Sequence, residues 1–165
     1  MPANPWWISQ GNMVARRSKS KRPSAGNDHS PRPPDSFVLY LDENLCNSKA
    51  ILEVLSRLSI RFERHLAHFS AGTPDHVWLP KVGEEGWVLL TADKRIRYNI
   101  LEKEALAEHQ VKEFVFVSGN LSGADMAAAL ENAINKMIRL TKRVEPPFVA
   151  AITRGGEVHM RWPKQ

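Results

Sequence analysis

Two aspartates follow runs of β-favouring apolar residues. Asp42 comes directly after FVLYL, and Asp93 comes two positions after WVLLT. Apolar runs that end abruptly in an acidic residue are typical of strands buried in a parallel sheet. Because the crevice of an open parallel sheet lies at the carboxyl ends of its strands, we expect the two carboxylates to share one edge. Such a pair suits Mg²⁺, which takes oxygen ligands, and a bound ion can clamp a phosphodiester and activate water.

Each of these acids also has a plainer interpretation. Asp42-Glu43-Asn44 could form an ordinary turn after a strand. Asp75 follows Thr73-Pro74, a helix-start pattern with Thr as N-cap and Pro at the first helical position, and an acid there is common because it suits the helix dipole. On spacing alone, a metal role for these residues stays open.

A basic cluster follows Asp93 at the end of its strand. It consists of Lys94, Arg95 and Arg97. An acid beside such a cluster suits a phosphate site, so we predict that these three side chains contact RNA phosphates, with a solvated charged loop as the alternative.

The elements that must position these residues alternate between strand and helix. The sequence predicts strands at 37–41, 60–66, 87–91 and 113–117, helices at 48–59, 74–85, 101–109 and 122–140, and a hairpin of 148–153 with 157–162 around Arg154-Gly155-Gly156. This order predicts an α/β fold with a mainly parallel sheet, helices on both faces and a terminal two-stranded extension.

Three motifs then resemble a known family. They are FVLYLDENL, GTPDHVWLPKVGEEGWVLLTADKRIR and FVFVSGNLSG. Together they resemble the PIN-like domain of VapC-type toxin ribonucleases, in the compact branch with an LDEN strand end, a TPD helix start and a T-x-D strand end. The resemblance covers residues 37–162.

The resemblance implies a three-layer α/β/α sandwich whose aspartates bind Mg²⁺ or Mn²⁺ and hydrolyse RNA under the control of a cognate antitoxin protein. Asp42, Asp75 and Asp93 match its three acidic positions and are the expected metal ligands and catalytic residues. A homodimer is compatible with this assignment. The resemblance also divides the chain into a tail, 1–36, and a nuclease domain, 37–165.

The fuller family pattern often has a fourth acid after the next strand, where this chain reads Ser118-Gly119-Asn120. Asn120 is therefore a neutral accessory candidate, and the number of metal ions, one or two, stays open. Glu43 is the other accessory candidate. Because adjacent side chains of an extended strand point to opposite faces, we expect Asp42 and Glu43 not to serve one ion equally.

Other chemically capable residues have structural interpretations. His65, His68 and His76 are close in sequence, but a zinc site needs several ligands in an enclosing scaffold, so we expect His65 and His68 at a loop or strand end. Cys46 has no His partner in a motif and is predicted to be a buried or partly buried thiol rather than a nucleophile. The helical spacing of Trp78, Leu79 and Val82 predicts core residues.

The net charge of +5 is concentrated in residues 1–36, where basic side chains outnumber acidic ones. This segment is rich in Arg, Lys, Ser and Pro and has too few apolar residues to offset the entropy of ordering it, so we expect a disordered tail. The tail could bind RNA without specificity or could be only a solubilising extension. One cysteine, no signal peptide and no apolar stretch of membrane-spanning length predict a cytoplasmic protein without membrane association.

Two other classes of function are compatible with acids at strand ends. A receiver-like phospho-acceptor domain gathers acids in the same way, but it needs a lysine after a late strand, and Ser118-Gly119-Asn120 offers none. A non-catalytic nucleic-acid-binding domain would use the basic tail, and metal binding at the acids would distinguish the enzyme from it.

Overall fold

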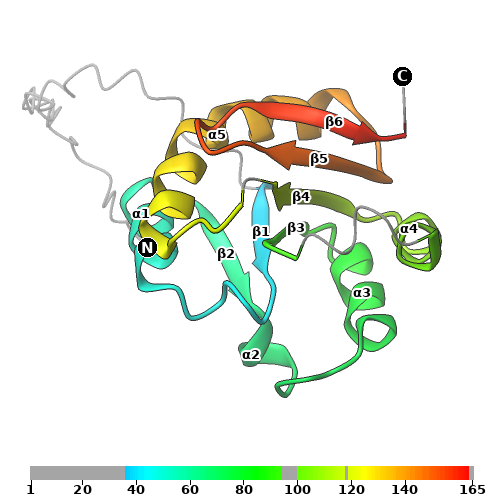
Figure 1. Cartoon of the computed structure of the whole chain (residues 1–165). Coiled ribbons are helices and arrows are strands. Elements are labelled where there is room, and N and C mark those ends of the chain that lie inside the picture. Colours follow the sequence, from blue (N-terminus) through cyan, green and yellow to red (C-terminus); the bar gives the residue numbers. More distant parts are fainter. Residues whose placement is uncertain (1–35, 94–99, 118, 164–165) are drawn as a thin grey trace, which may run out of the picture. The chain divides into compact units, whose positions relative to one another are not determined.

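The structure, a computed structural model, describes residues 36–93, 100–117 and 119–163 (Figure 1). The predicted tail, apart from Ser36, lies outside these residues. So do Lys94, Arg95 and Arg97, the predicted RNA contacts.

The centre of the fold is a six-stranded sheet in the order β2-β1-β3-β4-β5-β6. Neighbouring strands from β2 to β5 pair in parallel, and β6 pairs antiparallel with β5. The strands are β1 (Val38–Leu41), β2 (Arg61–Arg64), β3 (Val88–Thr91), β4 (Lys112–Phe116), β5 (Phe148–Ile152) and β6 (Val158–Trp162). Every residue of β3 and β5 is buried, as expected for strands covered on both faces.

Helices cover both faces of the sheet. They are α1 (Lys49–Arg57), α2 (His65–His68), α3 (Asp75–Glu84), α4 (Ile100–Glu108) and α5 (Gly123–Arg143). None of those that the structure describes is both long and apolar enough to cross a bilayer. The α/β/α sandwich predicted from the sequence is confirmed.

The two apolar cores assign the helices to their layers. One core joins Ile51 of α1 and Leu130 of α5 to Leu39 of β1. The other joins Trp78 of α3 and Leu106 of α4 to the sheet. Thus α1 and α5 pack on one face and α3 and α4 on the other, as Figure 1 shows.

The close packing of α3 against the end of α4 depends on Gly83. A Cβ atom built on Gly83 would lie 1.9 Å from the carbonyl oxygen of His109, far inside any real contact distance. Only glycine allows this approach, so the C-terminal half of α3 is fixed against the residue that follows α4.

Three local features differ from the sequence prediction. Helix α3 begins at Asp75, with Pro74 as its N-cap rather than its first residue, because Pro74 has an extended ψ of 150°. His65 and His68 form the helical turn α2 rather than a loop or strand end. The C-terminal hairpin exists, but it is no separate extension, since β5 continues the parallel sheet beside β4.

Candidate active site

A pocket of about 180 Å³ lies at the carboxyl ends of β1 and β3. All three aspartates singled out from the sequence line it. The lining residues are Asp42, Glu43, Asn44, His65, Thr73, Asp75, Trp78, Thr91 and Asp93. The expectation that Asp42 and Asp93 share one sheet edge is therefore met, while their role as metal ligands stays a prediction.

The pocket lies at the point where the sheet reverses its order. From β1 the chain crosses over α1 to the neighbouring strand β2, and from β2 it crosses over α3 to β3 on the other side of β1. The helices that follow these two strands, α1 after β1 and α4 after β3, pack on opposite faces of the sheet. Such a switch point opens a crevice at the strand ends, which is the usual ligand site of doubly wound sheets.

Asp42 is held as a direct continuation of β1. Its backbone N–H donates to the carbonyl of Leu90, at 3.3 Å, which extends the pairing with β3. Its Oδ1 accepts the backbone N–H of Leu45 at 3.0 Å, and its Oδ2 accepts the hydroxyl of Thr91. The residue is only 7% exposed. Both oxygens are thus oriented by donors from the protein.

Burial raises the pKa of Asp42 above its ordinary value. The hydrogen bonds from Thr91 and from the backbone of Leu45 oppose this rise, and the nearby negative charge of Asp93 adds to it. Since burial and a like charge both disfavour the ionised carboxylate, a cation in the pocket would relieve both effects.

Thr91 connects the two strand-end aspartates. Besides donating to Asp42, its Oγ1 accepts the backbone N–H of Asp93 at 3.0 Å. Thr91 is the last residue of β3 and is almost fully buried. The apolar pattern of β3 did not identify Thr91 as a site residue, although Thr91 is the threonine of the T-x-D motif.

Asp75 reaches the pocket from the first turn of α3 and is itself exposed. It also borders a smaller cavity between α3 and α4, together with Leu89 and Glu102. Its position at a helix N-terminus suits its negative charge and gives the pocket a third carboxylate.

The accessory candidates are placed differently from each other. Glu43 lines the pocket, because the chain turns after Leu41 and the alternation expected of a strand does not apply. Its Oε2 accepts the backbone N–H of Gly72 at 2.8 Å, and Gly72 adopts a φ of +73° that favours glycine. Asn120 is exposed and is not among the pocket's lining residues.

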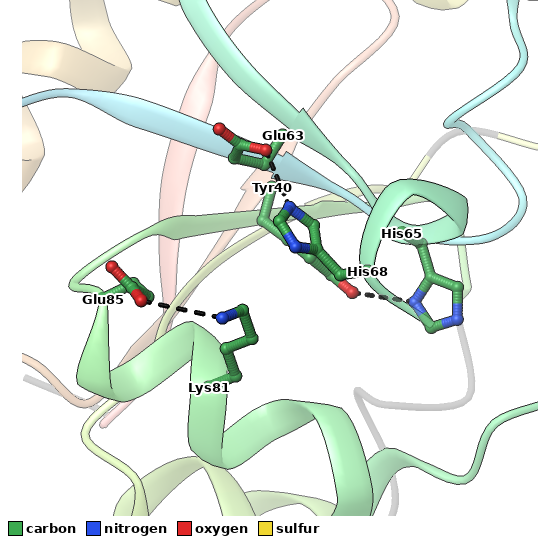
Figure 2. A network of polar contacts seen from close by, with 6 residues as sticks. All are labelled: Tyr40, Glu63, His65, His68, Lys81 and Glu85. Atoms are coloured by element: carbon green, nitrogen blue, oxygen red, sulfur yellow. Dashed lines mark hydrogen bonds and ion pairs between the residues drawn. The ribbon is translucent and has the colours of Figure 1, made fainter. Parts of the chain in front are cut away.

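Two aromatic residues, His65 and Trp78, line one side of the pocket, and Figure 2 shows His65 beside Tyr40 of β1. Tyr40 hydrogen-bonds to Nδ1 of His65 at 2.8 Å, and Trp78 stacks on Tyr40 with ring centroids 5.5 Å apart. His68, on the same helical turn, faces away to Glu63, with its Nε2 2.7 Å from the carboxylate. The core position of Trp78 is confirmed, whereas the sequence did not predict the buried contact of His65 with Tyr40.

Glu113 is a second group that the sequence pattern did not single out. It lies in the middle of the sheet on β4, where it is fully buried. Neither of its carboxylate oxygens has a hydrogen-bond partner among the described residues. Burial, followed by the charges of Glu102 and the three aspartates, raises the pKa of Glu113 to about 8. The sequence feature that could have identified this residue is a glutamate in the otherwise apolar run EFVFV.

The comparison with known families agrees with this geometry. Residues 37–118 match a family model described as a PIN-like domain. No curated protein and no solved structure matches the chain.

Residues 37–118 of the chain are similar to PIN-like domains.

The PIN-like match spans β1 to β4 and so includes all nine residues that line the pocket. The last three elements, α5, β5 and β6, lie outside it, although the sequence resemblance extended to residue 162. PIN-like domains are generally nucleases, so the match supports a hydrolase.

The donor set of the PIN-like pocket fits a hard divalent cation. Its ionisable side chains with oxygen donors are Asp42, Glu43, Asp75 and Asp93, and Mg²⁺ or Mn²⁺ prefers such oxygens. Among residues 36–93, 100–117 and 119–163, however, no three His, Cys, Asp or Glu side chains are gathered closely enough to form a ready-made metal cluster. Cys46 is buried, as predicted, and donates to the carbonyl of Glu43.

Proposed function

We propose that the protein is a metal-dependent endoribonuclease that hydrolyses RNA phosphodiester bonds in the pocket at the ends of β1 and β3. The observation that carries the proposal is the convergence of three carboxylates, from a strand end, a helix start and a second strand end, on one pocket at the switch point of the sheet. The PIN-like match supports the same class of chemistry.

In this proposal, Asp42, Asp75 and Asp93 hold the ion, and Glu43, which lines the same pocket, is the accessory ligand. Bound Mg²⁺ or Mn²⁺ supplies Lewis acidity and lowers the pKa of a coordinated water. The other tasks belong to the chain itself. Thr91 fixes the orientation of Asp42, and the turn after β1 presents Glu43.

The basic cluster Lys94, Arg95 and Arg97 directly follows Asp93 in the sequence. We assign it to the phosphates of the RNA on either side of the cleaved bond, because cationic side chains position the backbone without reading the bases.

The resemblance to toxin ribonucleases extends the proposal to a toxin restrained by a cognate antitoxin protein. Expression of the chain in bacteria should then arrest growth, and expression of the Asp93→Asn variant should not. Growth unaffected by the wild-type chain would remove the toxin assignment, and the ribonuclease assignment would then depend on cleavage by the purified protein.

The decisive experiment is RNA cleavage by the purified full chain with Mg²⁺, with Mn²⁺ and with EDTA. We expect cleavage only with a divalent ion, and none by Asp42→Asn or Asp93→Asn. Glu84→Gln is the matched control, because it removes one negative charge from an exposed position in the last turn of α3, the helix that begins with Asp75. Binding of RNA without cleavage would favour the non-catalytic alternative.

A further inference from the structure

The hydroxyl of Tyr40 has to donate its proton inside the protein. Tyr40 is fully buried on β1. A tyrosine hydroxyl has an ordinary pKa of about 10, so it carries its proton at neutral pH. A buried O–H without an acceptor costs about 1–3 kcal/mol. Among the described residues, the acceptor at hydrogen-bond distance is Nδ1 of His65, at 2.8 Å.

This contact defines the state of the His65 ring. Because Nδ1 accepts from Tyr40, the neutral ring carries its proton on Nε2. The ring is held from several sides: its centroid lies 5.7 Å from those of Phe69 and Trp78, and it stands perpendicular to Trp78. Figure 2 shows Nε2 on the side of the ring away from Tyr40.

The Nε2–H group is an unused donor. His65 is 1% exposed, and its Nε2 has no hydrogen-bond partner among the described residues. His65 nevertheless lines the same pocket as the carboxylates of Asp42, Asp75 and Asp93. A buried polar atom that lacks a partner beside a ligand pocket indicates that the ligand supplies the partner.

We propose that Nε2–H of His65 donates a hydrogen bond to a phosphate oxygen of the RNA in this pocket, with Tyr40 as the positioning residue that fixes the ring. The inference rests on the proposed function, which supplies the phosphate. The carboxylates of the pocket accept but do not donate, so they cannot bind a phosphate oxygen directly. A neutral donor on the pocket wall meets that need, and a donor fixed in advance needs no reorganisation when the charge on the phosphate changes.

The ring of Trp78, which is perpendicular to that of His65, is the alternative partner for the same N–H group. An N–H directed at an aromatic face is a weak hydrogen bond, and it would make His65 purely structural. Experiments on bound RNA separate the two roles, because only the phosphate contact changes when RNA enters the pocket.

The first experiment observes the wild-type full chain by NMR with ¹⁵N-labelled histidine. The probe is a short single-stranded RNA in Ca²⁺, checked by gel for cleavage. We expect an Nε2–H tautomer for His65 in the free protein and a shift of its Nε2 and Hε2 signals on RNA addition, with the ring signals of His68 unchanged. A different tautomer, or His65 signals that do not move while RNA binds, would overturn the proposal.

The second experiment compares matched variants on the same helical turn. His65→Phe should weaken binding of that RNA by about 10-fold, the value of one hydrogen bond to a charged group. His65→Gln, whose amide can reach the position of Nε2, should recover part of the affinity. Tyr40→Phe should lose less, since it frees the ring but keeps the donor. His68→Phe, which removes a histidine paired with Glu63, should bind as wild type.

The outcomes distinguish this inference from the proposed function. If wild type cleaves RNA and His65→Phe binds and cleaves equally well, the contact is wrong and the ribonuclease stands. If wild type cleaves nothing but loses RNA affinity on His65→Phe, the contact stands and the ribonuclease does not. If wild type binds no RNA, both are wrong. Should His65→Phe fail to fold, the NMR experiment on wild type decides.

Discussion

The hydroxyl of Thr91 donates a hydrogen bond to Oδ2 of Asp42, although the two residues are 49 positions apart in the chain. This contact joins the ends of the neighbouring strands β1 and β3 beside the pocket. Since the same hydroxyl oxygen accepts the N–H of Asp93, one side chain sets the orientation of one acid and the backbone of the other.

The first prediction concerns Thr91→Val, which keeps the shape of the side chain but removes its hydroxyl. Oδ2 of Asp42 then loses its donor, so we expect the free energy of unfolding at neutral pH to fall by about 1–3 kcal/mol. The affinity for Mn²⁺ should fall as well, because the carboxylate is no longer oriented. Chemical denaturation and calorimetric Mn²⁺ titration measure the two effects. Thr91→Ser, which retains the hydroxyl, is the control; if it behaves like Thr91→Val, the hydrogen bond is unimportant.

The second prediction concerns how substitutions of the three aspartates change the stability of the protein in the absence and in the presence of metal. Asp42→Asn or Asp93→Asn should leave the metal-free protein as stable as wild type or slightly more stable, because each substitution removes a like charge from the pocket. In wild type, Mn²⁺ at about 100 times its Kd should add roughly 2.7 kcal/mol to the stability. The aspartate variants should lose that gain, and Asp75→Asn, at the exposed helix start, should lose less of it.

Thermal unfolding with EDTA and with Mn²⁺ measures this prediction, and Glu84→Gln serves as the matched control. An Asp42→Asn, Asp93→Asn double variant that retains both the metal-dependent stabilisation and metal-dependent RNA cleavage would exclude the proposed site.

The third prediction concerns the pH dependence caused by Glu113. Its pKa is about 8 in the folded chain against an ordinary value of 4.5. Between these values the folded state holds a proton that the unfolded state has released. The stability should therefore decrease as pH rises through this window, by roughly 1 kcal/mol per pH unit.

Glu113→Gln removes this titration, so the metal-free variant should unfold at a higher temperature than wild type near pH 8, with the difference shrinking towards pH 5. Thermal unfolding across this range in EDTA is the measurement. Glu104→Gln, an exposed glutamate on the neighbouring helix α4, is the control. Parallel curves for wild type and Glu113→Gln would show that Glu113 stays ionised in the folded protein.

The fourth prediction concerns the basic residues that follow Asp93. Neutralising Lys94, Arg95 and Arg97 should weaken RNA binding and flatten its salt dependence by about one unit of slope for each phosphate that the protein no longer neutralises. Neutralising Lys19, Lys21 and Arg22 in the tail tests the other basic segment. A flatter salt dependence only in the tail variant would place RNA binding there instead.

Local patterns predicted the positions of Asp42, Asp75 and Asp93, because each depends on its own strand end or helix start. Contacts between distant segments were not predictable in this way. The bond of Tyr40 to His65 joins residues 25 positions apart and depends on how α2 packs beside β1. Glu113 lies in a strand that reads as apolar, and only the packing of the helices over it reveals that the carboxyl is buried without a hydrogen-bond partner among the described residues.

The parallel pairing of β1 with β3 also decides when, during synthesis, the pocket can form. Leu41 pairs with Leu90, so the pocket is made of segments separated by α1, β2, α2 and α3. A ribosome delivers these segments in order, and pairing over such a long separation has to overcome the entropy of closing the intervening chain. A nascent chain that ends before β3 therefore has Asp42 and Asp75 but no partner strand to hold them together. A polypeptide can therefore form this pocket only after it extends beyond β3.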